Sequence, residues 1–314
     1  MARIDILLAT YNGEKYLDSL LSSIESQTFS DWRILISDDG STDKTLDKIR
    51  EWQRHSNRIS LVKSGNPSGS ARANFMNLLS YSNADYLAFC DQDDVWHPDK
   101  LVKCLEEMLK LENQQETSSK PFLVFSDARV VDSNLNPIDD SFIRYSGLDS
   151  SRTQLNHLLV QNIAPGCTML LNRSLVTLLS QASHSSKVYM HDWWAMLIAS
   201  ALGSIAHINE PLIDYRQHND NSVGATSYSL SLIPFWLNRL DEMVDYFKAL
   251  MLQGEEFNKY YGNQLTSEQS QLLQSFSNLS QNGPVGRFSN VTKHKLWKNR
   301  LMLCVGEAYC LLKI

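Results

Sequence analysis

The sequence predicts an α/β fold: a mostly parallel sheet flanked by helices, followed by a helical C-terminal extension. Over roughly the first hundred residues, short apolar runs alternate with segments of helical periodicity. Acidic or glycine-rich clusters stand where the apolar runs end. This alternation is typical of βαβ units, in which successive strands are parallel.

The first block contains four expected strands and three expected helices. The strands are apolar runs at residues 4–9, 34–36, 59–62 and 86–90. Apolar residues recur at helical spacing near residues 17–24, 46–49 and 75–79. Because ligands bind at the carboxyl ends of strands in open α/β sheets, we expect Asn12, Asp39 and Asp91 on one rim.

A second block continues to about residue 223. It contains strand-like runs at residues 122–125, 169–171 and 212–215 and a helical run at 193–202. From about residue 227 the character changes, and residues 230–252 show long helical periodicity. We therefore expect a catalytic domain over residues 1–226, divided into parts 1–110 and 111–226, and a helical extension over 227–314.

Charge, cysteine content and apolar runs argue against several classes of protein. The formal net charge of the 314 residues is −6, and the absence of a large basic stretch argues against a nucleic-acid partner. The five cysteines are odd in number and show no CxxC spacing, which indicates buried thiols in a reducing cytosol. The first residues are too polar for a signal peptide, and no apolar run is long enough to span a membrane. We expect a cytoplasmic protein.

Residues 91–94 (Asp-Gln-Asp-Asp) carry the strongest chemical signal, because they directly follow an apolar strand. Two carboxylates one residue apart can converge on a hard divalent cation such as Mg²⁺. An acidic turn would give the same pattern. A phosphatase-type enzyme with Asp91 as nucleophile and Asp93 beside it is a third interpretation. Such phosphatases usually carry this motif on their first strand, whereas three βα units precede it here.

Four segments together resemble the family 2 glycosyltransferases, in order and in spacing: residues 9–14 (Ala-Thr-Tyr-Asn-Gly-Glu), 37–43 (Ser-Asp-Asp-Gly-Ser-Thr-Asp), 69–74 (Gly-Ser-Ala-Arg-Ala-Asn) and 91–94. The resemblance is strong over residues 1–110 and weaker to about 223. It implies a GT-A fold, a nucleoside-diphosphate sugar as donor, and inversion at the anomeric carbon.

The resemblance also implies a donor site. Thr10, Tyr11 and Asn12 would line the nucleotide pocket, with Tyr11 against the base. Asp39 would accept the ring N–H of uracil or thymine. Arg72 would pair with phosphate or with a carboxylate of the site, unless it is an ordinary surface arginine.

A metal site follows from the same motifs. Asp93 would bind Mg²⁺ or Mn²⁺ directly, Asp91 would face ribose or metal-bound water, and Asp94 would hold the loop. Residues 215–218 (Tyr-Arg-Gln-His) resemble the family's terminal segment, in which His218 would complete the metal shell or touch diphosphate.

The resemblance also implies that Asp192 is the general base, because in this family an acidic residue at such a place takes the proton from the acceptor hydroxyl. It lies in residues 190–194 (Met-His-Asp-Trp-Trp), which open a helix whose dipole would keep the carboxylate ionised. A simple helix cap is the alternative. Trp193 and Trp194 could offer an aromatic face to a sugar, although at least one of them should be core.

The motifs together look most like bacterial rhamnosyltransferases of cell-surface polysaccharide synthesis. That resemblance implies dTDP-L-rhamnose, or otherwise a UDP-sugar, as donor and a polyprenyl-linked glycan as acceptor. The basic and aromatic residues of 293–303 would then form a helix that lies on the inner face of the plasma membrane or packs on the catalytic domain. A non-catalytic sugar-binding protein on the same fold is the alternative from a different functional class.

Overall fold

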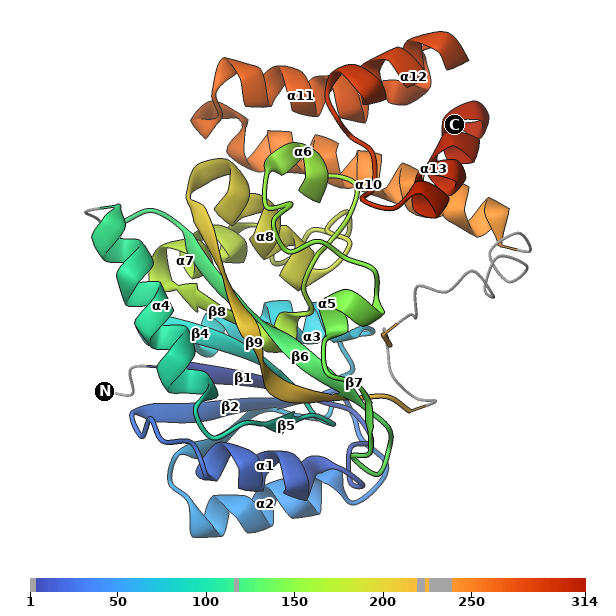
Figure 1. Ribbon diagram of the computed structural model, residues 1–314. Helices are drawn as coiled ribbons and strands as arrows, with labels where there is room; N and C mark the ends of the chain where they lie inside the picture. The colour runs from blue at the N-terminus through green and yellow to red at the C-terminus, as the bar shows by residue number, and fades with distance from the viewer. Residues whose placement is uncertain (1–3, 116–118, 219–223, 226–238) are drawn as a thin grey trace.

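The computed structural model describes residues 4–115, 119–218, 224–225 and 239–314 (Figure 1). Its centre is a nine-stranded sheet with the order β3-β2-β1-β4-β8-β6-β9-β5, and β7 pairs with β6 beside this path. The strands are β1 (Ile4–Thr10), β2 (Trp32–Asp38), β3 (Ile59–Lys63), β4 (Tyr86–Asp91), β5 (Val95–Trp96), β6 (Phe122–Val131), β7 (Pro137–Asp139), β8 (Met169–Asn172) and β9 (Ser204–Arg216).

All seven predicted strands are confirmed, and β9 begins well before the predicted run at 212. The first four strands are parallel to one another, as expected. Beyond β4 the sheet becomes mixed, because β8 runs antiparallel to both β4 and β6, while β6 and β9 are parallel. The whole sheet is therefore mixed, and the predicted parallel order holds for its N-terminal half.

Helices cover both faces of the sheet (Figure 1). Those of the catalytic part are α1 (Leu17–Glu25), α2 (Thr45–His55), α3 (Ala71–Leu78), α4 (Lys100–Gln114), α5 (Phe142–Tyr145), α6 (Leu155–Leu158), α7 (Arg173–Gln181) and α8 (His191–Leu202). Short 3-10 turns η1 (Leu79–Tyr81) and η2 (Gly166–Thr168) precede β4 and β8. Side chains of β1 alternate between the layers: Ile6 and Leu8 join the core under α1 and α4, and Leu7 joins the core with α3, α7 and α8.

The C-terminal extension shares the second of these cores. It consists of α10 (Leu240–Tyr261), η4 (Gly262–Gln264), α11 (Ser267–Ser277), η5 (Leu279–Gln281), α12 (Pro284–Lys293) and α13 (Leu301–Lys313). Trp194 of α8 is fully buried, donates its indole N–H to the Tyr261 hydroxyl at 3.3 Å and packs against Phe257. The helical extension is thus present and continuous with the catalytic core. The predicted boundary at 226 lies outside the described residues and stays a prediction.

The basic segment after residue 293 differs from its prediction. It is not one helix, because α12 ends at Lys293 and α13 begins at Leu301. The connection packs on the catalytic part: Leu296 is fully buried, Asn156 donates to the His294 carbonyl at 3.1 Å, and Asn299 donates to the Gly147 carbonyl at 2.8 Å. These contacts favour packing over membrane contact for the connection. Within the described ranges, no helix combines the length and apolarity needed to cross a bilayer.

Candidate active site

The carboxyl ends of β1, β2 and β4 form the predicted rim. In the parallel register, Thr10 stands opposite Asp38, and Ala9 stands opposite Asp91. The loops that follow these strands are therefore adjacent, and the amide of Asp39 donates to the Thr10 carbonyl at 2.8 Å. The sequence prediction that three distant segments meet at one edge is confirmed.

Tyr11 and Asn12 have different surroundings in the first loop. The Tyr11 side chain is 58% exposed, while its backbone N–H and carbonyl are both bound by the Gln92 side-chain amide at 2.9 Å. Asn12 adopts a left-handed backbone with φ of 49°, and its Oδ1 accepts the Thr42 amide at 2.8 Å. The ring of Tyr11 is thus available to a ligand, whereas the Asn12 side chain ties the first two loops together.

The carboxylates of Asp38 and Asp39 differ in burial and in hydrogen bonding. Asp38 is fully buried and accepts hydrogen bonds from the Thr10 hydroxyl, from the Gly40 amide and from both the amide and the hydroxyl of Ser41. It holds the turn and does not cap a helix. Asp39 is only half-buried and accepts from the Ser68 amide, which leaves carboxylate capacity for a nucleobase N–H.

Arg72 lies in the first turn of α3, but its guanidinium does not point into open solvent. It donates to the Ser185 carbonyl at 2.6 Å, in the segment that precedes α8. It also lies close enough to His191 to contribute to the lowered pKa of that imidazole. The structure therefore links Arg72 to the segment before the expected base, with further N–H groups available for a phosphate.

The acidic loop after β4 is held from the end of β9. Arg216 is 4% exposed, and its guanidinium donates to the Asp93 carbonyl at 2.6 Å. The backbone N–H of Arg216 donates to Asp94 Oδ1 at 3.1 Å. Asp94 is fully buried, as expected for a residue that holds the loop, and burial beside Asp93 and Asp91 raises its pKa well above the ordinary value.

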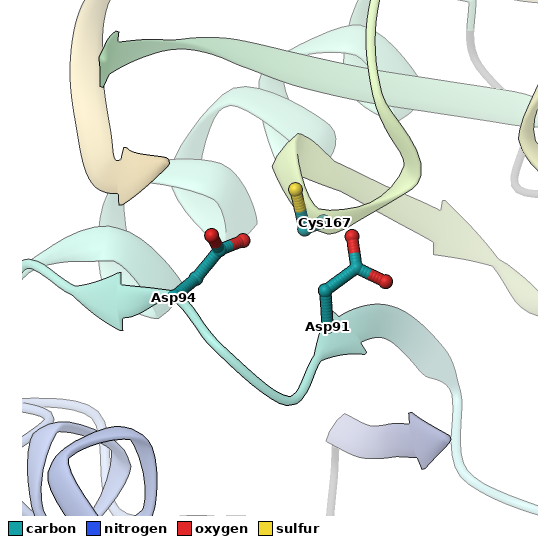
Figure 2. Close-up of side chains that lie close together, drawn as sticks. All are labelled: Asp91, Asp94 and Cys167. Carbon is teal, nitrogen blue, oxygen red and sulfur yellow. The ribbon is translucent and has the colours of Figure 1, made fainter. Parts of the chain in front are cut away.

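The predicted metal ligands fall into two groups. The imidazole Nε2 of His218 lies 2.7 Å from Asp93 Oδ2, and its ring packs on Tyr16. Asp91 instead shares its surroundings with Asp94 and Cys167, and the donor atoms of these three lie within 4.8 Å of one another (Figure 2). Burial and the charge of Asp93 raise the pKa of Asp91 to about 7.

The donor set fits the expected cation. Carboxylate oxygens suit Mg²⁺, and a carboxylate with an imidazole also suits Mn²⁺. Asp93 and His218 already face each other, although they are 125 positions apart in sequence. A cation between them would replace their direct contact.

Asp192 occupies the second position of α8, because the helix begins at His191 with Met190 as its cap. The carboxylate is 7% exposed and accepts the Gly166 amide at 3.1 Å and the Trp193 amide at 2.7 Å. Burial outweighs these hydrogen bonds and raises the pKa of Asp192 to about 6. The expectation of a simple helix cap, or of a carboxylate governed by the helix dipole alone, is therefore corrected.

The neighbours of Asp192 are packed side chains. His191 stacks on Phe75 with ring centroids 4.2 Å apart, and burial lowers its pKa to about 3, so the imidazole is neutral. Trp193 is 3% exposed and Trp194 is fully buried. Both tryptophans are core residues, so the idea that one of them presents its face to a sugar is wrong.

Sequence reasoning assigned no role to three residues that shape the site. Gln92 clamps the backbone of Tyr11, Arg216 fixes the acidic loop, and Cys167 contacts its carboxylates. Gln92 and Arg216 lie inside the motifs at residues 91–94 and 215–218. Their polar side chains within these motifs were the sequence signal that could have pointed to a role in the site. Cys167 lies in residues 164–169, which resemble the family's loop bordering the acceptor site, but that resemblance did not place it beside Asp91.

Comparisons with known proteins agree with this geometry. The sequence model of "Glycosyl transferase family 2" matches residues 5–175. The dTDP-rhamnosyl transferase RfbG of Shigella flexneri is 31% identical over 230 residues, which cover 69% of this chain and 74% of that protein. An Escherichia coli protein named UDP-Glc:alpha-D-GlcNAc-diphosphoundecaprenol beta-1,3-glucosyltransferase WfgD is 28% identical, over 55% of this chain and 61% of that protein.

Two solved structures share the fold. The fragment TarS 1-349 from S. aureus, in complex with UDP, superposes with a TM-score of 0.54 at 14% identity, covering 98% of this chain and 88% of that fragment. The mannosyltransferase PcManGT from Pyrobaculum calidifontis, in complex with GDP-Man and Mn²⁺, gives 0.55 at 12% identity, covering 99% and 85%. At such identities the likeness shows the fold alone, which is GT-A. On the family match and the RfbG similarity, the chain belongs to glycosyl transferase family 2 and is a glycosyltransferase.

Proposed function

We propose that this glycosyltransferase inverts the anomeric carbon of a nucleotide sugar, with Asp192 as the general base. One observation carries the proposal: the buried Asp192 carboxylate accepts the amide of Gly166 at 3.1 Å, and the next residue, Cys167, lies against Asp91 and Asp94 of the acidic loop. Burial raises the pKa of Asp192 to about 6. A base with such a pKa is largely ionised at neutral pH and still holds a proton well once it has received one.

The donor nucleotide is proposed to lie on the rim of the first two loops. The exposed ring of Tyr11 would stack on the base, and the half-buried carboxylate of Asp39 would accept the N3–H of uracil or thymine. Thr10 is buried and bonded to Asp38, so it would support the pocket from below. Arg72 would approach the diphosphate from α3.

Asp93, with Asp91 and His218, would hold the divalent cation. Mg²⁺ or Mn²⁺ bound there supplies positive charge that offsets the charge on the departing diphosphate. The chain's own part is to orient these donors: Arg216 fixes the loop carbonyl at Asp93, and Tyr16 supports the imidazole ring.

The reaction needs one displacement. The acceptor oxygen forms its bond to C1 as the bond between C1 and the diphosphate oxygen breaks, and the diphosphate leaves with the electron pair. Asp192 takes the proton that the acceptor hydroxyl loses. Because attack comes from the face opposite the diphosphate, the configuration at C1 inverts and no covalent sugar–enzyme intermediate is required.

For the substrates, we propose dTDP-L-rhamnose as donor and a polyprenyl-linked glycan as acceptor in bacterial polysaccharide synthesis. The similarity to RfbG supports the rhamnosyl donor, and the name of WfgD supports a lipid-diphosphate acceptor. Such an acceptor would bring the enzyme from the cytoplasm to the inner face of the plasma membrane, in peripheral contact.

Two other functions were open from the sequence. Family membership overturns the phosphatase-type interpretation, in which Asp91 is the nucleophile and Asp93 lies beside it. A non-catalytic sugar-binding protein would have no need of a carboxylate held at a pKa near 6 beside an acidic loop.

The test is a panel of dTDP-L-rhamnose, UDP-glucose, UDP-N-acetylglucosamine and GDP-mannose, measured for binding with and without Mg²⁺ or Mn²⁺. We expect tight, metal-dependent binding of dTDP- or UDP-sugars and slow release of free sugar in the absence of acceptor. If no nucleotide sugar binds with either metal, the proposed function is wrong. A preference for a UDP-sugar would replace rhamnose and leave the mechanism intact.

A further inference from the structure

Tyr189 is an exposed aromatic side chain close in sequence to the proposed base. Among the described residues, the exposed large aromatics are Tyr11, Tyr81 and Tyr189, with exposed fractions of 58%, 45% and 41%. Tyr11 belongs to the donor loop, and Tyr81 precedes β4 at the opposite, amino edge of the sheet. Of these three tyrosines, Tyr189 is the one that belongs neither to the donor loop nor to the amino edge of the sheet.

The distance from Tyr189 to the base is short. It precedes Asp192 by three residues, and a fully extended chain of three residues spans at most about 11 Å. The ring also packs edge-on against Trp193, the next residue after the base, with centroids 5.8 Å apart at 81°. One sugar ring with its substituents can bridge such a distance, so a glycan whose hydroxyl reaches Asp192 comes within reach of this ring.

The ring is held in place from two sides. Besides Trp193 of the base helix, Tyr246 of α10 packs edge-on against it, with centroids 5.2 Å apart at 83°. The backbone N–H of Tyr189 donates to Gln253 Oε1 at 2.8 Å, and Gln253 is 1% exposed on α10. An aromatic ring fixed before its ligand arrives loses little conformational freedom on binding.

The segment that carries Tyr189 is anchored to the C-terminal extension at a second point. The Ser185 hydroxyl donates to Glu256 Oε1 at 2.9 Å, and Glu256 is 5% exposed on α10. Arg72 binds the carbonyl of the same serine. The polar groups that α10 buries against the catalytic part therefore fix residues 185–190, directly before the base helix.

We propose that Tyr189 is a stacking platform for the acceptor sugar, built jointly by the start of α8 and by α10. Its ligand would be a pyranose ring that lays an apolar C–H face on the exposed part of the phenol ring. The proposal rests on the proposed function and deepens it, because it locates an acceptor subsite and gives the C-terminal extension a part in forming it.

Ligand-observed NMR tests the platform with methyl glycosides of D-glucose, N-acetyl-D-glucosamine, D-galactose and L-rhamnose, in the presence of dTDP or UDP and the diamagnetic cation Mg²⁺. We expect at least one glycoside to bind, and Tyr189→Ala to weaken its binding about tenfold. Tyr189→Phe should stay within about twofold of wild type. Tyr189→Leu, which keeps apolar bulk without an aromatic face, should lose most of the binding.

Tyr81→Ala is the matched control, because it removes an equally exposed tyrosine at the far edge of the sheet. The platform is refuted if no glycoside binds the wild type, or if Tyr189→Ala and Tyr189→Leu bind as the wild type does. Nucleotide-sugar binding, measured on the same samples, separates the two proposals. If the wild type binds no nucleotide sugar, the proposed function is contradicted. If the wild type binds the nucleotide sugar and glycoside binding does not depend on Tyr189, only the platform is contradicted.

Discussion

We call residues 1–110 the donor half and residues 111–226 the acceptor half, after their proposed substrates. Asp38 in the donor half and Asp192 in the acceptor half are both buried carboxylates, but their surroundings differ. Asp38 accepts hydrogen bonds from Thr10, Gly40 and Ser41, so its lone pairs are committed to holding a turn. Asp192 accepts the amides of Gly166 and Trp193 and a hydrogen bond from the Asn162 side chain, and burial still raises its pKa to about 6. The Asp38 carboxylate therefore supports the turn, whereas burial leaves the Asp192 carboxylate able to take a proton near neutral pH.

The two halves are also assembled differently. The donor rim consists of loops that each follow a strand, and its hydrogen bonds mostly link residues of neighbouring loops. The base pocket combines segments from several parts of the chain: Gly166 before β8, His191 and Asp192 on α8, and the α10 residues that anchor segment 185–190. Disturbing the rim should therefore affect donor binding, and disturbing the pocket should affect transfer.

The largest effect is expected from the donor rim, at Asp93. Asp93→Ala removes the carboxylate that faces His218, so the charge on the departing diphosphate is no longer offset. Turnover should fall about 10³-fold or more, measured with a saturating nucleotide sugar and Mn²⁺. Asp47→Ala, an exposed acid on α2, should leave turnover unchanged. Full activity of the wild type in excess chelator would contradict a metal-dependent rim.

The acceptor half should control the pH profile. Because the pKa of Asp192 is raised to about 6, the carboxylate is ionised above that pH and protonated below it. Transfer should therefore fall about tenfold for each pH unit below 6, while donor binding changes less. A rate that is flat between pH 5 and 7 would contradict the assignment of the base.

The same shift has a consequence for stability. The folded pKa lies above the ordinary value of 3.8, so the folded protein binds the proton more tightly than the unfolded chain does. Because of Asp192, the free energy of unfolding therefore falls as pH rises through the window between about 4 and 6. Replacing Asp192 by asparagine should not destabilise the protein at pH 7.

A smaller and more selective effect is expected at Asp39. Asp39→Ala removes the acceptor for a pyrimidine N3–H, so binding of dTDP and UDP should weaken about tenfold, as measured by titration calorimetry. Binding of GDP, which we expect to be weak in the wild type, should hardly change. Equal affinity of the wild type for purine and pyrimidine nucleotides would show that Asp39 does not read the base.

The smallest effect on transfer, but a clear one on stability, is expected at Leu296. This side chain is fully buried where the connection between α12 and α13 packs on the rest of the fold, so Leu296→Ala should cost about 2–4 kcal/mol of unfolding free energy. Leu312→Ala, at a position that is 57% exposed, is the control. An unchanged melting temperature for Leu296→Ala would indicate that the extension is a separate module.

The donor half was largely predictable because its signals are local. A strand, an acidic turn and a helix follow one another within about 30 residues, so apolar runs and polar clusters identify both the elements and the rim. Even there, the sequence did not show that the Asp38 carboxylate would be occupied by hydrogen bonds within the turn while the Asp39 carboxylate remained accessible. That difference depends on which of the two side chains points inward.

The acceptor half was less predictable because its strand order and the burial of its side chains depend on contacts between distant segments. The antiparallel insertion of β8 between β4 and β6 has no local signal. The burial of Trp193 depends on the packing of α8 in the core and on the Leu158 carbonyl that accepts its indole N–H. Asp192 was identified through its resemblance to a family motif, and the raised pKa of its carboxylate could be learned only from the packing around it.

The central claim is that Asp192 removes the proton from the acceptor hydroxyl in a single displacement. Asp192→Asn keeps the size of the side chain and an oxygen that can accept the Gly166 amide, but it cannot take the proton. We predict that the folded variant binds the nucleotide sugar almost normally and transfers at least about a hundredfold more slowly, with inversion at C1 in the wild-type product. Near-normal transfer by the folded variant, or retention of configuration by the wild type, would contradict the account.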